Sequence, residues 1–487
     1  MKQGLRGTEL RRAIDTLEAD CQNRARDRLL KSIPTLLAQV RDTGHVRLRA
    51  LDWYWRAGLH KEGVKAALCH PISGERVASQ SALLSLPEEQ LLWASRFLIS
   101  VGAWPVGQNL LGHLHPRSTR GRVLLAMDHL GLGNHAQVVS TLEKVSASPA
   151  REIRWHVITT FARAYLELGE NTLAHRWAKR GLEVVKTDPD RWVLECLRAM
   201  AVAALGENRK GLELFAANER RIADIAALAP HWFGYSRIWK SRLLVALGQR
   251  QAARACLDQA QQHYERGMQD LQPWRTLMVL DEMKTQELLT PRERDAYDRY
   301  PLKPPLCRNQ SSAPWESSSS IYQLQLSADE WTEKGQPRLG IPLDLRLAAA
   351  LTLAGDIGIH TNLLKCWLWP EALASFFQLD GRLTQLVHRL RFEHGFHILR
   401  ERDSLWMDPA GRSQLSVQPG SDEPPAFVTM HGKNSFAASE VARFYSVSTR
   451  TAQLVLAKWL ETGWLKREGA GRATQYQMIR ATRGHPA

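Results

Sequence analysis

The stretch AYLELGENTLAHRWAKRGLEVVKTDPD, residues 164–190, decides the fold of the first half of the chain. Apolar and small residues recur at three- and four-residue steps on both sides of Gly169, which predicts two helices joined at that glycine. A glycine permits the left-handed turn that closes a helix. Ala174 lets the second helix cross the first closely, and Ala178 fills the seam between them. The stretch therefore predicts an antiparallel pair of helices, with Pro189 beyond its end.

The same arrangement returns along residues 1–300. Glycines that end a helix recur at spacings between 31 and 44 residues, and they are Gly58, Gly102, Gly133, Gly169, Gly206 and Gly248. The fifth residue after each glycine is mostly small, and these residues are Gly63, Gly107, Val138, Ala174, Gly211 and Ala253. The ninth is apolar, and these residues are Ala67, Leu111, Leu142, Ala178, Phe215 and Leu257. Because one pair cannot bury its apolar face alone, we expect the pairs to stack.

Two of these units resemble tetratricopeptide repeats: residues 164–190, and VALGQRQAARACLDQA at residues 245–260. The resemblance extends over about residues 45–265 and is degenerate in the other units. It implies an α-solenoid whose concave groove binds a peptide or partner protein, or senses a ligand. A purely structural scaffold is the alternative.

The charge and cysteine content restrict the partner and the compartment. The formal net charge is +15, which suits a polyanionic partner without saying which one. The six cysteines form no CxxC pair or zinc-finger spacing, so reduced thiols in a cytoplasmic protein are expected. The N-terminus lacks the apolar segment of a secretory signal, and no apolar run is long enough to span a membrane.

Two segments rich in proline and serine predict linkers at residues 301–320 and 409–425. They would separate a helical-repeat domain at 1–300 from two compact blocks at 321–408 and 426–487. The expected fold class is mainly α, with an α-solenoid followed by two small α+β domains.

The block at 321–408 predicts a strand at 321–326, two helices, a third helix in GRLTQLVHRLRFEHG (381–395) and a hairpin in FHILRERDSLWMD (396–408). Leu383, Leu386, Val387 and Leu390 form one apolar stripe of the third helix. This order resembles the winged helix of OmpR/PhoB-type response regulators, although no receiver domain precedes it. The resemblance implies DNA contacts in the major groove, at phosphates and from the wing by Arg382, Gln385, His388, Arg389, Arg391, Arg400 and Arg402. A winged fold used for protein contact is the alternative here.

The block at 426–487 has the order of a helix-turn-helix followed by a hairpin, in SEVARFYSVSTRTAQLVLAKWLETGWLKREGAGRATQYQMI (439–479). Ser439 and Ser448 are expected to cap the two helices. The second helix should bury Ala452, Val455, Leu456 and Trp459. The order resembles bacterial winged-helix domains, in which a Gly-x-Gly-Arg-x-Thr-x-Tyr wing follows the recognition helix.

Charge favours DNA binding by this second block. Residues 426–487 hold nine Lys and Arg against three Glu, a net charge of +6. Arg450, Gln453 and Lys458 are expected to be exposed on the second helix, and the first two have the donors to reach base edges. Lys466, Arg467 and Arg472 are expected to contact phosphates.

No enzyme motif stands out, and no catalytic residue, cofactor or metal site is expected. GLGNHA at 131–136 has the glycines of a dinucleotide-binding motif but follows no strand. The histidines of GHLHP (112–116) and HGFH (394–397) have no second pair of metal ligands at suitable spacing. The leading hypothesis is a cytoplasmic bacterial transcriptional regulator that binds double-stranded DNA, as a possible homodimer, while its repeats receive a protein or peptide partner. The alternatives are a protein-interaction scaffold and a replication or transposition factor of a mobile element.

Overall fold

A computed structural model describes most of the chain, in two compact units. The described residues are 7–22, 26–39, 43–56, 58–69, 77, 80–145, 151–185, 188–219, 230–267, 272–301, 303, 314–317, 320–333, 336–369, 379–401, 403–419, 425, 427–428, 435–461, 463–469 and 474–479. The helical unit extends to Thr290, and the C-terminal unit holds most of the chain from Pro291 onward.

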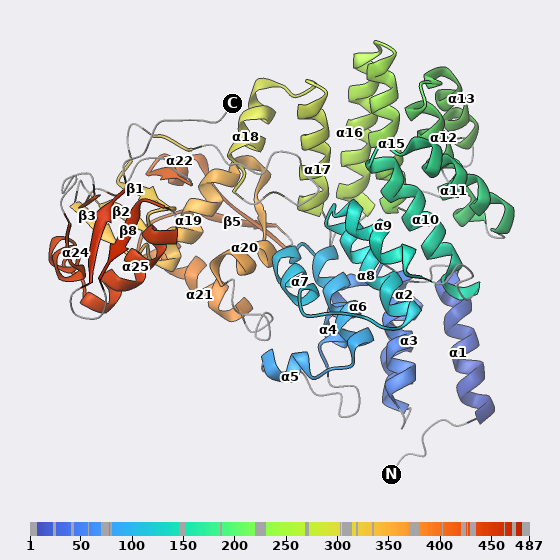
Figure 1. Cartoon of the computed structure of the whole chain (residues 1–487), viewed down its shortest axis with the longest axis horizontal. Helices are drawn as coiled ribbons and strands as arrows, with labels where there is room; N and C mark the ends of the chain where they lie inside the picture. Colours follow the sequence, from blue (N-terminus) through green and yellow to red (C-terminus); the bar gives the residue numbers. More distant parts are fainter. Residues whose placement is uncertain are drawn as a thin grey trace. The chain divides into compact units, whose positions relative to one another are not determined.

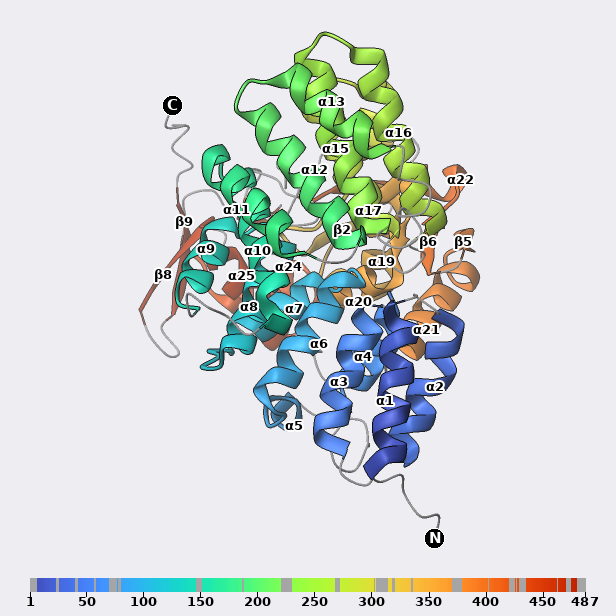
Figure 2. The same ribbon diagram turned by 90° about the vertical axis from the view of Figure 1, so that its right-hand side faces the viewer.

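The helical unit is a series of tetratricopeptide-like helix pairs (Figure 1 and Figure 2). The first helices of neighbouring pairs also contact each other, as α6, α8, α10, α12 and α15 do in turn. The helices are α1 (Gly7–Gln22), α2 (Arg26–Gln39), α3 (Thr43–Arg56), α4 (His60–Ala67), α5 (Gln80–Leu84), α6 (Glu88–Ser100), α7 (Trp104–Leu111), α8 (Thr119–Gly131), α9 (His135–Glu143), α10 (Arg151–Glu167), α11 (Asn171–Val184), α12 (Asp188–Ala204), α13 (Asn208–Glu219), α15 (Pro230–Ala246), α16 (Arg250–Gly267) and α17 (Gln272–Thr285).

The predicted turn glycines are confirmed. All six adopt a positive φ, between 69° at Gly58 and 94° at Gly206. At each turn the residue after the glycine donates its backbone N–H to the carbonyl five residues earlier, as Glu170 does to Tyr165 at 2.9 Å. This bond satisfies a carbonyl that the helix end would otherwise leave unpaired.

The predicted seam is also confirmed, because the residues at the fifth and ninth places after each glycine are buried. Ala174 and Ala178 are 1% and 0% exposed. A Cβ on Gly63 would lie 2.2 Å from the ring of Phe97, so only glycine fits there without displacing that ring. Close helix crossing therefore depends on the small residues that the repeat pattern singles out.

The C-terminal unit contains three small sheets, with strand orders β3-β2-β1-β7, β4-β6-β5 and β8-β9. Strand β7 is parallel to β1, and the other pairs are antiparallel. The elements are α18 (Pro291–Arg299), β1 (Tyr322–Gln325), β2 (Glu330–Glu333), β3 (Gln336–Leu339), α19 (Leu343–Ala354), the 3-10 turn η1 (Gly355–Ile357), β4 (Ile359–His360), α20 (Thr361–Leu368), α21 (Leu379–Phe392), β5 (Ile398–Glu401), β6 (Ser404–Met407), α22 (Pro409–Arg412), β7 (Leu415–Gln418), α24 (Ala438–Phe444), α25 (Thr449–Glu461), β8 (Leu465–Glu468) and β9 (Gln475–Met478).

The end of the predicted repeat domain belongs to the C-terminal unit instead. Helix α18 packs against α19, and the hydroxyl of the buried Tyr300 donates a 3.0 Å hydrogen bond to the carbonyl of Gly358. Buried aromatic side chains thus place residues 291–300 with the second unit rather than the first.

The predicted linker at 409–425 is wrong over residues 409–418, which form α22 and β7. Leu415 and Val417 alternate inward and are 0% exposed, which explains why a strand forms there. In the other predicted linker, Trp315 exchanges backbone hydrogen bonds with Val417 at 2.9 and 2.7 Å. Residues 302, 304–313, 318–319, 420–424 and 426 lie outside the described residues.

The two C-terminal blocks pack together within this unit. The indole N–H of Trp459 donates a 2.8 Å hydrogen bond to the carbonyl of Ala328. The hydroxyl of Tyr445 donates a 3.1 Å hydrogen bond to Glu330, and Leu339 joins the apolar cluster of α24 and α25. The last block therefore completes its core with the β1–β2 turn and with β3.

Candidate nucleic-acid interface

Helix α25 has one buried and one exposed face. Ala452, Val455, Leu456 and Trp459 are buried, as predicted. The exposed face includes Arg450, Gln453 and Leu454, and Leu454 is 69% exposed. Sequence reasoning missed this leucine, although the three- and four-residue spacing of the buried residues already excludes it from the core.

The caps of α24 and α25 hold the two helices at a tight turn. Ser448 accepts a 3.1 Å hydrogen bond from the backbone N–H of Thr451, which confirms it as a cap. The predicted cap at Ser439 is wrong, because that residue lies inside α24. The helix begins after Ala437, whose backbone N–H donates a 2.7 Å hydrogen bond to the carboxylate of Glu440. The turn contains Ser446 at φ 55°.

The β8–β9 hairpin follows α25 and presents Lys466 and Arg467, both exposed. Since neighbouring residues of a strand point to opposite faces, these two cations lie on different faces of the hairpin. Lys466 also pairs with Glu468 at 2.8 Å. Arg472 lies outside the described residues.

Lys458 departs from the exposed position expected for it. It is half-buried, and burial lowers the pKa of its ammonium, with Asp329 opposing the shift. Asp329 belongs to the β1–β2 turn, so Lys458 faces the first block. It is therefore a poor candidate for a DNA contact.

Helix α21 of the first block exposes Arg382, Gln385 and His388, as predicted. Its core face holds Leu383, Leu386 and Leu390, whereas Val387 is half-buried. His388 lies with its ring 4.3 Å from that of Phe392, which is 75% exposed. Phe392 is a second exposed apolar side chain that the sequence did not single out.

The remaining arginines of this block differ in the side-chain interactions that they make. Arg391 donates a 2.6 Å hydrogen bond to the carbonyl of Ile398 and thereby ties α21 to β5. Arg389 lies 3.7 Å from the carboxylate of Asp344. Arg400 is exposed on β5, and Arg402 lies outside the described residues. Arg391 is thus a structural residue, and Arg382 is the better candidate for contacting a polyanion.

One cluster of this block has the donor types of a metal site. Ligand atoms of Asp344, Glu393 and His394 lie within 4.8 Å of one another. The hydroxyl of Tyr322 lies 3.2 Å from Nδ1 of His394. However, the guanidinium of Arg389 already lies beside Asp344, so the carboxylate has a cationic partner.

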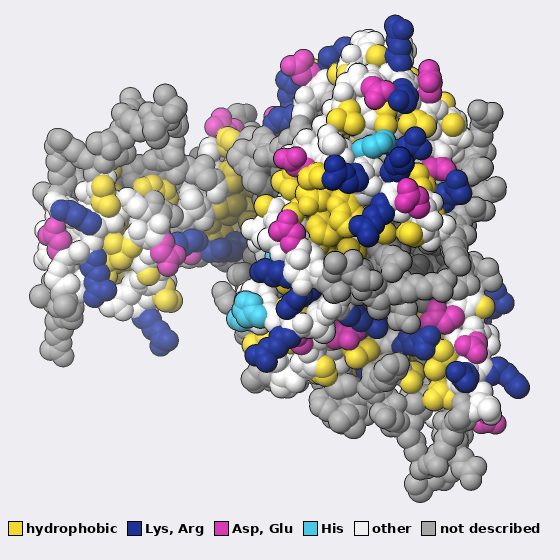
Figure 3. Space-filling view, turned by 45° about the vertical axis from the view of Figure 1, so that its right-hand side comes forward, with side chains coloured by type: hydrophobic (Ala, Val, Ile, Leu, Met, Phe, Trp, Pro, Cys, Tyr) yellow, Lys and Arg dark blue, Asp and Glu magenta, His cyan; other side chains and the backbone are white. Residues whose placement is uncertain are grey.

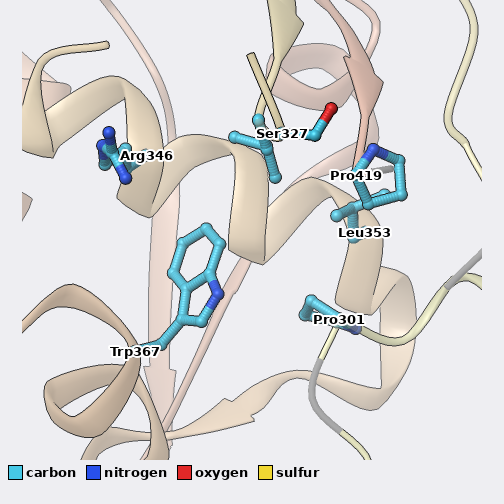
Figure 4. Close-up of a pocket in the computed structure, with 7 residues that line it drawn as sticks. Pro301, Ser327, Arg346, Leu353, Trp367 and Pro419 are labelled. Carbon is cyan, nitrogen blue, oxygen red and sulfur yellow. The ribbon is translucent and has the colours of Figure 1, made fainter. Parts of the chain in front are cut away.

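A cavity of about 240 Å³ lies between α19, α20 and the end of β1 (Figure 4). Leu353 and Trp367 form apolar parts of its wall. Its cation, Arg346, pairs with Asp329 and donates from Nε to the carbonyl of Ile341 at 3.1 Å. Among the described residues that line the cavity, Arg346 is the only charged one, and the protein itself pairs it.

In the helical unit, a polar network joins α10, α15 and α17. Tyr235 donates a 2.5 Å hydrogen bond to Glu167. Arg242 donates two hydrogen bonds, of 2.8 and 2.7 Å, to Glu282 and lies 3.8 Å from Glu167. Burial alone would lower the pKa of Arg242, but these carboxylates raise it.

On the face that Figure 3 shows, Lys and Arg side chains lie among hydrophobic ones.

Comparisons with known proteins show a distant similarity to a solved structure. No family model and no curated protein matches the chain. A crystal structure of a tetratricopeptide repeat protein from Parabacteroides merdae ATCC 43184 is 12% identical, with a TM-score of 0.32. The match covers 55% of this chain and 98% of that chain. A likeness this distant carries no argument about function.

Among the described residues, no helix is long and apolar enough to cross a membrane.

Proposed function

We propose that this chain is a DNA-binding transcriptional regulator whose helical unit docks a protein partner. The exposed face of α25 carries the proposal, since Arg450 and Gln453 lie opposite the buried face and a hairpin with Lys466 and Arg467 follows. The two C-terminal blocks would be winged helices, with α21 and α25 as their recognition helices. The net charge of +6 over residues 426–487 supports a polyanionic partner.

Binding of the full chain to genomic DNA fragments tests this proposal. Fragments that the protein retains are sequenced, and their affinity is compared with that of random duplex over a range of salt concentrations. Arg450→Ala should cost about 1–3 kcal/mol on retained fragments and relax specificity. Arg467→Ala should weaken binding to all sequences. It should also reduce the slope of log binding constant against log salt concentration by about 1.

Lys210→Ala is the matched control, because it removes an exposed positive charge in the helical unit that pairs with Glu207. This variant should leave the affinity for retained fragments and the affinity for random duplex unchanged. Equal affinity for retained and random duplexes at every salt concentration would contradict a site-specific regulator.

A protein-interaction scaffold is the second candidate. The exposed Leu454 and Phe392 favour it, because large apolar side chains on helix faces are typical anchors of protein interfaces. In this case the double variant Leu454→Ala with Phe392→Ala loses a captured partner, whereas Arg450→Ala leaves DNA retention unchanged.

A further inference from the structure

A shallow groove of about 460 Å³ crosses the surface of the helical unit between α13 and α16, over α15. One end is apolar and is lined by Leu212 and Leu244, with Ala252 and Ala255 exposed at its rim. The other end holds Glu219, Arg237 and Lys240. Its volume lies within the range of about 300–1,000 Å³ that is typical of small-molecule sites.

The charged end contains two cations and one carboxylate. Glu219 accepts hydrogen bonds from both Arg237 and Lys240. The side chains of Arg237 and Lys240 are 11% and 16% exposed. Burial would raise the pKa of Glu219, but the hydrogen bond from Lys240 and the charge of Arg237 outweigh it and lower the pKa. Glu219 therefore stays ionised at neutral pH, and the described lining residues hold two basic side chains against this one carboxylate.

Among the described residues that line the groove, Glu219 is the only carboxylate. The guanidinium of Arg237 lies 4.8 Å over the ring of Phe233, which offers an attraction but no charge. The thiol of Cys256 also lines the groove, and burial raises its pKa, so it is neutral. Because a poorly solvated cation without a counter-charge is unfavourable, a second anion would be stabilised at this end.

We infer that this groove binds a small organic carboxylate with an apolar body. Its carboxylate pairs with Arg237 and Lys240, whose guanidinium and ammonium carry more N–H donors than Glu219 uses. Its apolar body covers Leu212 and Leu244. The site is separate from the DNA-binding proposal, so either one can fail while the other stands.

Saturation-transfer NMR on the full chain tests the inference with three probes: hexanoate, acetate and 1-hexanol. Hexanoate should bind at least about tenfold tighter than hexanol, since hexanol cannot form the charged hydrogen bonds. Acetate should bind more weakly than hexanoate because it lacks the apolar body. No signal from hexanoate, or equal binding of hexanoate and hexanol, overturns the inference.

Three variants locate the binding. Ala255→Trp fills the groove from its exposed rim and should abolish the hexanoate signal, while Ala217→Trp, exposed on α13 outside the lining, should retain it. Lys240→Gln removes the excess charge and should weaken hexanoate binding but not hexanol binding. Undiminished hexanoate binding by Ala255→Trp, with the helical content of both tryptophan variants unchanged, would place the probe elsewhere and refute the site.

Discussion

Tyr235 on α15 donates a 2.5 Å hydrogen bond to Glu167 on α10, across 68 residues of sequence. Arg242 lies on the same helix as Tyr235 and reaches Glu167 from one side and Glu282 from the other. Helices α10, α15 and α17 are thus joined by buried and half-buried polar side chains in addition to apolar packing. Such a network fixes helix positions only while every member has its partner.

Removing the Tyr235 hydroxyl should therefore destabilise the helical unit. Tyr235→Phe should cost about 1.5–3 kcal/mol, the usual value for a hydrogen bond to a charged group. Urea unfolding followed by circular dichroism measures the change. Tyr165→Phe on α10 is the control, because no hydrogen bond of its hydroxyl is found in the described part of the chain. Equal midpoints for the two variants would show that the bond contributes nothing.

The glycine at the α4–α6 seam gives a second prediction. Gly63→Ala should cost about 1–3 kcal/mol, because its Cβ would overlap the ring of Phe97 and force a repacking. Gly131→Ala should be neutral or stabilising, since the Cβ there meets its nearest atom at an ordinary 3.5 Å and alanine favours a helix. Thermal unfolding compares the two. A stable Gly63→Ala variant would mean that the ring moves freely.

Asp128 should make stability depend on pH. Burial raises the pKa of its carboxyl to about 8, although Arg96 at 3.5 Å opposes the shift. The folded chain thus binds this proton more tightly than the unfolded chain, for which the pKa is about 4. Its stabilising contribution is complete below about pH 4 and is lost as the pH rises through about 8.

Asp128→Asn removes this titration. Unfolding midpoints measured from about pH 5 to about pH 9 should fall more steeply for the natural chain than for the variant. Parallel curves would show that Asp128 has an ordinary pKa in the folded chain.

The arginines of α21 should separate into two kinds. Arg391→Gln should lower the unfolding temperature, because it breaks the hydrogen bond to Ile398 that ties α21 to β5. Arg382→Gln, on the exposed face, should leave stability unchanged and weaken DNA binding if this block contacts DNA. Anisotropy titrations with retained fragments, paired with thermal unfolding, measure both. A stability loss for Arg382→Gln would reverse the assignment.

The contact between the two C-terminal blocks should make them unfold together. Tyr445→Phe removes the hydrogen bonds to Glu330 and to the backbone of Phe427, and it should cost about 1–3 kcal/mol. The amide hydrogen-exchange rates should then rise in both β2 and α24. Faster exchange confined to α24 would show that the blocks are energetically independent.

The repeat pairs were predictable because local residues determine them. Glycine marks each of the six predicted turns, and the fifth and ninth places follow from helical periodicity alone. The turn at Glu287 could not be found this way, because a non-glycine residue adopts φ 56° there while Leu288 makes the same backbone bond to Met283. Only the packed structure reveals that this position has the geometry of the other turns.

The candidate interface was predictable in part. The buried face of α25 follows from periodicity, and so does the exposure of Arg450 and Gln453. The burial of Lys458 does not, because it depends on the β1–β2 turn of a different block. Strand β7 was missed for a similar reason: four residues among serines and prolines form a strand only because β1 and Trp315 supply hydrogen-bonding partners.

The pairing of β7 with β1 also limits how this protein can evolve by exchange of parts. Strand β7 follows the first block in sequence but completes its sheet, and the last block covers Leu339 of that sheet. A recombination breakpoint between residues 408 and 415 would leave one sheet without its parallel edge and expose apolar surface in both products. Descendants are therefore expected to inherit residues 291–479 as a single piece, with breakpoints tolerated before α18.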